Sequence, residues 1–171
     1  MKKELLLLTL LTTSIFAEKV VISDILKANY SDKISVEKKN LILTKDEAKA
    51  IQKEAEAKLN SKIVRLYKVE EGSEVAGYAV LLKRKVRTKN AAVLYMLDNN
   101  QTIKAIEIVS FKEPLEYKPN DSWREVFEGK SSADMLISGK DIPTISGATM
   151  SAKSITDMSR IALAIIEAKT K

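Results

Sequence analysis

The chain has 171 residues, of which 45% are hydrophobic and 30% are charged, and this globular composition excludes a disordered tail, a collagen-like repeat and a coiled-coil rod. It contains neither cysteine nor histidine, which excludes disulfides, iron–sulfur clusters, thiolate or imidazole metal sites, and a Ser-His-Asp hydrolase. The formal net charge of +6 is mildly basic and does not indicate a nucleic-acid-binding protein. The chemistry that remains is that of hydroxyls, carboxylates, lysines or a bound cofactor.

The first 17 residues have the pattern of a secretory signal peptide. Lysines at positions 2 and 3 precede a short apolar run over 5–11, small polar residues follow over 12–14, and Ile15 and Phe16 then lead to Ala17. The run is shorter than the about 20 apolar residues of a membrane span. We therefore expect cleavage after Ala17 and export, to the periplasm or otherwise out of the cytoplasm, with residues 18–171 as a single domain. A buried N-terminal helix or an uncleaved anchor is the alternative interpretation.

The next segments predict a helix followed by a run of strands. Residues 18–43 are mixed, whereas Thr44 and Glu47 form a capping box and the apolar spacing after them predicts an amphipathic helix over 45–59. Strand-like apolar segments follow over 63–69, 77–87, 91–97 and 102–111, with turn-forming residues between them. Because parallel crossovers need a dozen or more residues, these short connections favour antiparallel hairpins.

The last part of the chain predicts two further helices. A short one is expected over 121–128, with Trp123 and Phe127 on one side, and a long one over about 150–168. A central antiparallel sheet packed with helices is an α+β fold. Trp123, Tyr95 and Tyr117 could stack on an aromatic ligand, although aromatic residues in a small domain more often belong to the core.

A cluster of basic residues occupies the end of the strand segment over 77–87. Lys83, Lys85, Arg87 and Lys89 alternate in sequence and would share one face of a strand. We favour a solvated sheet face over a patch that binds an anion or a membrane surface.

The segment Ser146-Gly147-Ala148-Thr149 stands between the predicted sheet and the final helix. Gly147 allows a backbone conformation that is closed to other residues. Thr149 falls at or near the N-cap, where the first backbone N–H groups lack partners and the helix dipole suits an anionic phosphate. On spacing alone, a turn with a hydroxyl cap is the simpler interpretation.

These four residues resemble the Ser/Thr-Gly-Ala-Thr/Ser core of the FMN-binding domain family. That family includes the flavin-bearing small subunits of the sodium-pumping NADH:quinone reductase and the ion-pumping ferredoxin:NAD reductase. The resemblance covers roughly residues 60–170, including the segments 77–80, 93–109 and 123–130. It implies an FMN-binding-domain-like α+β fold and FMN attached by a phosphoester bond to the hydroxyl of Thr149, with Ser146, Gly147 and Ala148 completing the binding motif.

The resemblance also implies a maturation partner, a separate flavin transferase that uses FAD and magnesium. The family usually has an aspartate three residues before the Ser/Thr of the motif, and Pro143 occupies that position here. Asp141, two residues farther upstream, is the candidate replacement. If that carboxylate guides the transferase, attachment is expected to be slower, or FMN to be held without a covalent bond.

The expected function is that of an exported flavoprotein that transfers electrons in a respiratory or extracytoplasmic redox chain, with a membrane or periplasmic redox partner. In this interpretation the flavin carries the redox chemistry. No catalytic residue is assigned, and no protein-bound metal or nucleic acid is expected. Two alternatives stay open: a non-redox exported binding module whose motif only begins a helix, and a flavin-dependent reductase with a substrate pocket beside the flavin ring.

Overall fold

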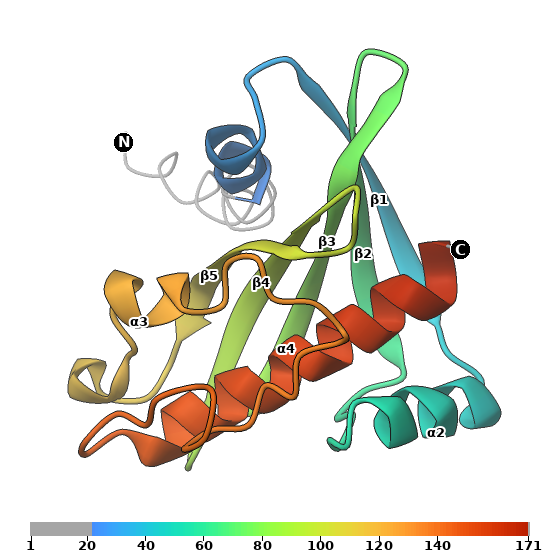
Figure 1. Cartoon of the computed structure of the whole chain (residues 1–171). Coiled ribbons are helices and arrows are strands. Elements are labelled where there is room, and N and C mark those ends of the chain that lie inside the picture. Colours follow the sequence, from blue (N-terminus) through green and yellow to red (C-terminus); the bar gives the residue numbers. More distant parts are fainter. Residues whose placement is uncertain (1–21, 171) are drawn as a thin grey trace, which may run out of the picture.

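A five-stranded antiparallel sheet forms the centre of the molecule (Figure 1). The computed structural model describes residues 22–170, so the predicted signal peptide over 1–17 lies outside the described residues. The strands follow one another across the sheet in chain order: β1 (Ile34–Ile42), β2 (Ile63–Glu71), β3 (Glu74–Lys85), β4 (Asn90–Asp98) and β5 (Ile103–Phe111). All neighbouring strands are antiparallel, which confirms the predicted α+β class with hairpin connections.

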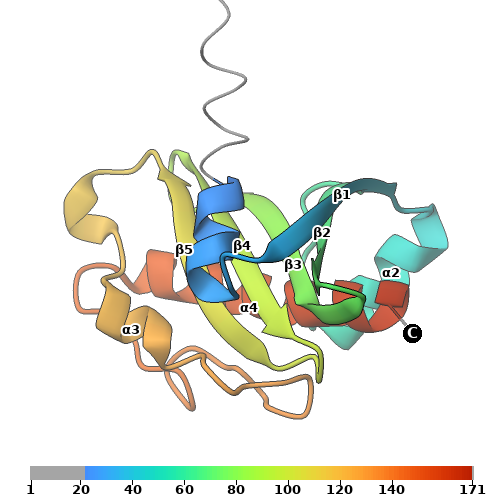
Figure 2. The ribbon, with the colours of Figure 1, turned by 90° about the horizontal axis from the view of Figure 1, so that it is seen from above.

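Helices cover both faces of this sheet (Figure 2). The C-terminal helix α4 (Thr149–Thr170) crosses one face, and a helix over 22–29 lies on the other. β4 contributes to both layers, because Tyr95 packs in the core cluster under α4 while Met96 packs with Leu26 on the opposite face. A strand that is buried on both faces has a continuous apolar sequence, and the sequence of β4 is of this kind.

The helix α2 (Lys45–Glu54) begins at the predicted capping box and ends earlier than predicted. The hydroxyl of Thr44 accepts from the N–H of Glu47 at 3.2 Å, and the Glu47 carboxylate accepts from the N–H of Thr44 at 2.7 Å. The prediction extended the helix to residue 59. It was wrong at that end because Glu56 has a φ of 45°, which no right-handed helix contains, and the carbonyl of Ala55 accepts from Arg160 of α4.

Other boundaries also differ from the sequence-based expectation. β3 ends at Lys85, so Arg87 and Lys89 belong to the β3–β4 turn and do not share a strand face with Lys83 and Lys85. The short helix α3 (Asp121–Glu125) starts as predicted, with the Asn120 side chain accepting from the Trp123 N–H at 3.0 Å. The predicted end at residue 128 was wrong, because the N–H groups of Phe127 and Glu128 donate to carbonyls three residues earlier, as in a turn. A 3₁₀ turn, η1 (Leu115–Tyr117), precedes it.

The long helix α4 starts one residue before the predicted boundary and ends two residues after it. Its buried residues pack in the main core cluster with β2, β3, β4 and β5. Among the helices within residues 22–170, none has the combination of length and apolarity that a membrane crossing requires.

Candidate functional site

The motif forms a tight turn that leads directly into α4. The carbonyl of Ile145 accepts from the N–H of Ala148 at 2.9 Å, and Gly147 has a φ of +76°. A positive φ at the third position of such a turn is favourable for glycine and strained for a residue with a Cβ. The carbonyl of Ala148 then accepts the first helical hydrogen bonds, from Ser151 at 3.0 Å and Ala152 at 3.1 Å. The motif therefore has one defined backbone conformation.

Thr149 is the first residue of α4, and its side chain is exposed. Within residues 22–170 its hydroxyl accepts no hydrogen bond from the helix, so it does not act as a side-chain cap. The N–H groups of Thr149 and Met150 likewise find no acceptor in this part of the chain. Free N–H groups at a helix start carry partial positive charge and suit an anionic group. The start of α4 thus combines the hydroxyl of Thr149, which makes no hydrogen bond within residues 22–170, with two backbone N–H donors that lack an acceptor there.

A pocket of about 240 Å³ opens beside the start of α4. One side consists of the motif and the first turn of the helix, and the other consists of the β3–β4 turn and the segment after β5. The lining residues are Val86, Arg87, Glu113, Tyr117, Gly147, Ala148, Thr149, Met150 and Ser151. This volume is smaller than the about 300–1,000 Å³ of typical small-molecule sites, so it fits the phosphate end of a nucleotide better than a whole one.

Glu113 connects the two segments that form the second side of the pocket, the β3–β4 turn and the end of β5. Its side chain is only 6% exposed, and its carboxylate accepts from three successive backbone N–H groups, those of Arg87 at 3.0 Å, Thr88 at 2.5 Å and Lys89 at 2.7 Å. The Thr88 hydroxyl donates to its second oxygen at 3.1 Å. The N–H of Lys89, together with those of Thr88 and Arg87, outweighs the opposing effect of burial and lowers the pKa of Glu113 from 4.5 to about 2. Glu113 therefore stays ionised at neutral pH and holds the turn in place.

Trp123 fixes the chain just before the motif. Its indole N–H donates to the carbonyl of Pro143 at 2.8 Å, and its ring packs edge-on against Phe127 with 5.2 Å between ring centroids. Tyr95 is fully buried and donates its hydroxyl to the carbonyl of Ile155 at 2.9 Å, and burial raises its pKa. Of the three aromatic residues considered above, only Tyr117 lines the pocket.

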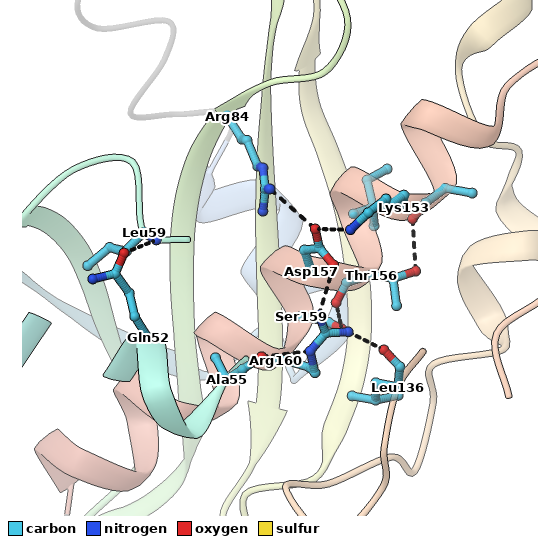
Figure 3. A network of polar contacts seen from close by, with 12 residues as sticks. Gln52, Ala55, Leu59, Arg84, Leu136, Lys153, Thr156, Asp157, Ser159 and Arg160 are labelled. Atoms are coloured by element: carbon cyan, nitrogen blue, oxygen red, sulfur yellow. Dashed lines mark hydrogen bonds and ion pairs between the residues drawn. The ribbon is translucent and has the colours of Figure 1, made fainter. Parts of the chain in front are cut away.

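A buried ionic cluster holds α4 against the rest of the fold (Figure 3). Asp157, with a side chain 7% exposed, receives Lys153 at 2.8 Å and Arg84 of β3 at 3.2 Å on one oxygen, and Arg160 at 2.8 Å on the other. Arg160 also donates to the carbonyl of Ala55 at 2.7 Å. Because these contacts reach the sheet and the end of α2, they fix the position of the helix that presents Thr149.

The structure brings some of the predicted site residues together and not others. Gly147, Ala148 and Thr149 line the pocket, whereas Ser146 and Asp141 do not. The Asp141 carboxylate accepts from the N–H of Ile137 at 2.8 Å within its own loop. Burial there favours the neutral acid, but the surrounding backbone N–H groups outweigh it and lower the pKa of Asp141.

Sequence reasoning missed the two charged residues that line the pocket, Arg87 and Glu113. The sequence pattern predicts Arg87 only as part of a basic cluster on a strand, whereas β3 ends at Lys85. Glu113 follows β5, and no local pattern links it to a turn that lies 24 to 26 residues earlier in the chain. Glu113 could have been recognised as an acidic residue that stands beside a proline at the end of a strand. Such a carboxylate can bind the unpaired N–H groups of a neighbouring turn.

Taken together, these features define a class of site. The start of a helix that packs on an antiparallel sheet can bind an anion, and an exposed hydroxyl stands at the first residue of that helix. Residues 88–164 match the family model described as the FMN-binding domain, and this part of the chain belongs to the FMN-binding domain family. The match begins in the β3–β4 turn and includes β4, β5, the motif and most of α4. Comparison with curated proteins and with solved structures gave no match.

Membership of this family supports FMN as the cofactor and a flavoprotein in electron transfer. The site fits such a group on its own geometry, since unpaired N–H donors, a cation and a hydroxyl converge on one pocket. Gly147 in particular leaves open space, because a Cβ added there would meet nothing within 4 Å.

Proposed function

We propose that this chain is an exported flavoprotein that carries FMN on the hydroxyl of Thr149 and transfers electrons in a respiratory or extracytoplasmic redox chain. The observation that carries the proposal is the position of Thr149. Its exposed hydroxyl stands at the first residue of α4, at a pocket that suits the phosphate of a nucleotide, inside the stretch that matches the FMN-binding domain. Bound flavin supplies the capacity to take up and release electrons.

The attachment step requires only the hydroxyl from this chain. The Thr149 oxygen bonds to the phosphorus of the FMN half of FAD, the anhydride bond between the two phosphates breaks, and AMP leaves. The hydroxyl proton passes to a base of the transferase or to water, and no electrons are exchanged. Because Thr149 is exposed and its hydroxyl is not engaged within residues 22–170, a separate enzyme can reach it without unfolding the turn.

The rest of the site retains and orients the phosphate. The free N–H groups at the start of α4 donate toward an anion at the pocket, and the helix dipole adds to this attraction. Trp123 holds Pro143, and the Ile145–Ala148 hydrogen bond closes the motif turn, so the chain on both sides of the hydroxyl is fixed. Outside the cytoplasm a covalent bond prevents loss of the cofactor, which is consistent with the signal-like pattern over 1–17.

Co-expression with a flavin transferase tests this proposal. The purified chain should fluoresce as flavin after denaturing electrophoresis, and Thr149→Ala should abolish that signal. Thr144→Ala is the matched control, since Thr144 is a neighbouring exposed hydroxyl that does not line the pocket. Flavin that survives in Thr149→Ala, or that is lost in Thr144→Ala alone, would identify a different acceptor.

The departure at Pro143 has its own test. If the family's usual aspartate guides the transferase, Pro143→Asp should be labelled faster than the native chain. If Asp141 guides the transferase in place of that aspartate, Asp141→Asn should be labelled more slowly than the native chain. Initial labelling rates under limiting transferase distinguish these two cases, and equal rates in all three proteins would show that no carboxylate is needed there.

A further inference from the structure

The β3–β4 turn forms the wall of the pocket that faces the motif. The N–H of Val86 donates to the carbonyl of Lys89 at 2.9 Å, which closes the turn, and the Glu113 carboxylate binds the three N–H groups that follow Val86. Val86 and Arg87 line the same pocket as Thr149. The two walls come from segments about 60 residues apart, and Glu113 is the residue that joins the turn to the end of β5.

A carboxylate that is 6% exposed is costly unless its oxygens are hydrogen-bonded. In Glu113 the oxygens are engaged by three backbone N–H groups and the Thr88 hydroxyl. Three convergent N–H donors on one carboxylate oxygen specify the conformation of the turn more tightly than its sequence would. The turn is therefore rigid where it carries Arg87.

Arg87 is the cation of this pocket. Within residues 22–170 its guanidinium has no acidic partner, and Glu113 is the only carboxylate residue that lines the pocket, with its oxygens directed at backbone N–H groups. On the opposite wall the first N–H groups of α4 are unpaired. Arg87 has an exposed side chain and lines the same pocket as the start of α4. An arginine and a helix start at one pocket can together recognise a phosphate, because both supply charged or polarised N–H donors.

We infer that Arg87 binds the phosphate of the flavin and that Glu113 is a positioning residue that holds Arg87 at the pocket. The identity of the ligand rests on the proposed function, whereas the recognition of its phosphate does not depend on a covalent bond. The β3–β4 turn is then part of the cofactor site, and not a solvated loop.

The test uses the full chain produced without a transferase, titrated with FMN and with riboflavin, which lacks the phosphate. The native chain should bind FMN more tightly than riboflavin. Arg87→Gln should weaken FMN binding about tenfold, the factor that corresponds to one lost charge-assisted contact, and leave riboflavin binding within about twofold. Arg87→Lys should recover part of the loss. Lys85→Gln, which removes a nearby exposed cation that does not line the pocket, should change neither affinity.

Glu113→Gln tests the positioning role. It should reduce the preference for FMN over riboflavin even though Arg87 is present, and thermal unfolding of each variant separates this effect from a loss of folded protein. If Glu113→Gln does not fold, the Arg87 variants still decide the main inference. Equal affinity of the native chain for FMN and riboflavin, including binding of neither, contradicts it, and so does an FMN preference that survives Arg87→Gln.

These outcomes are independent of the covalent proposal. A chain that prefers FMN through Arg87 but is never labelled at Thr149 contradicts the proposed attachment and supports the inference. A chain that is labelled at Thr149 but whose FMN preference does not depend on Arg87 supports the attachment and contradicts the inference.

Discussion

Substitution of Asp157 by alanine removes a carboxylate that binds three cations along α4 and from β3 (Figure 3). Asp157 is 7% exposed, and its partners Arg84 and Arg160 have side chains that are 19% and 16% exposed. The Nη1 atom of Arg84 is already buried without a hydrogen-bond partner. Without Asp157, two largely buried guanidinium groups would lose their carboxylate partner.

Breaking a buried ion pair by removing one partner costs about 3–5 kcal/mol, because the remaining charge is left uncompensated. For a protein of this size each kcal/mol lowers Tm by about 2–4 °C, so Asp157→Ala should lower it by roughly 6–20 °C. Lys153→Ala is the matched control. It removes a cation from the same carboxylate, but the Lys153 side chain is 69% exposed, and the loss should stay below about 1 kcal/mol.

Chemical denaturation followed by circular dichroism measures both variants under the same conditions. The reasoning requires a large difference between them, with Asp157→Ala the less stable. Equal losses of stability, or a loss below about 1 kcal/mol for Asp157→Ala, would show that water reaches the two arginines and replaces the carboxylate.

Three further predictions concern stability. Gly77→Ala should cost about 1–3 kcal/mol of unfolding free energy, since an added Cβ would lie 2.1 Å from the carbonyl oxygen of Leu97, and an unchanged denaturation midpoint would show that β3 and β4 can separate. Thr44→Ala should cost about 1 kcal/mol by removing the cap of α2, and urea titration should detect it; a gain in stability would contradict the capping box. The N–H of Lys89 and its neighbours lower the pKa of Glu113 from 4.5 to about 2, so Glu113 stabilises the fold above about pH 4.5 and loses that effect as the pH falls toward 2. The native chain should therefore lose more stability between pH 6 and pH 3 than Glu113→Gln does, and parallel profiles would refute this.

The central sheet could be predicted from the sequence because its signals are local. β4 is apolar along almost its whole length, the turns on either side of it contain turn-forming residues, and the Thr44–Glu47 capping box identifies the start of α2. β1 was not predicted, because an edge strand buries little. Its middle, Glu37–Asn40, is exposed and polar and gives no strand periodicity.

The candidate site was predicted only in part, for a physical reason. The motif turn and the start of α4 depend on neighbouring residues such as Gly147, so they can be recognised in the sequence. The second wall depends on a contact between Glu113 and a turn more than 20 residues away, which exists only after β5 has paired with β4. The signal peptide over 1–17, export, and the single-domain boundary at residue 18 stay predictions.

The intact mass of the chain, purified after co-expression with a competent flavin transferase, tests the central claim most directly. A mass that exceeds that of the polypeptide by one FMN less one water, with the added mass on the peptide that contains Thr149, is the predicted result. The bare polypeptide mass, obtained while an established substrate of the same transferase is labelled in the same cells, would contradict it.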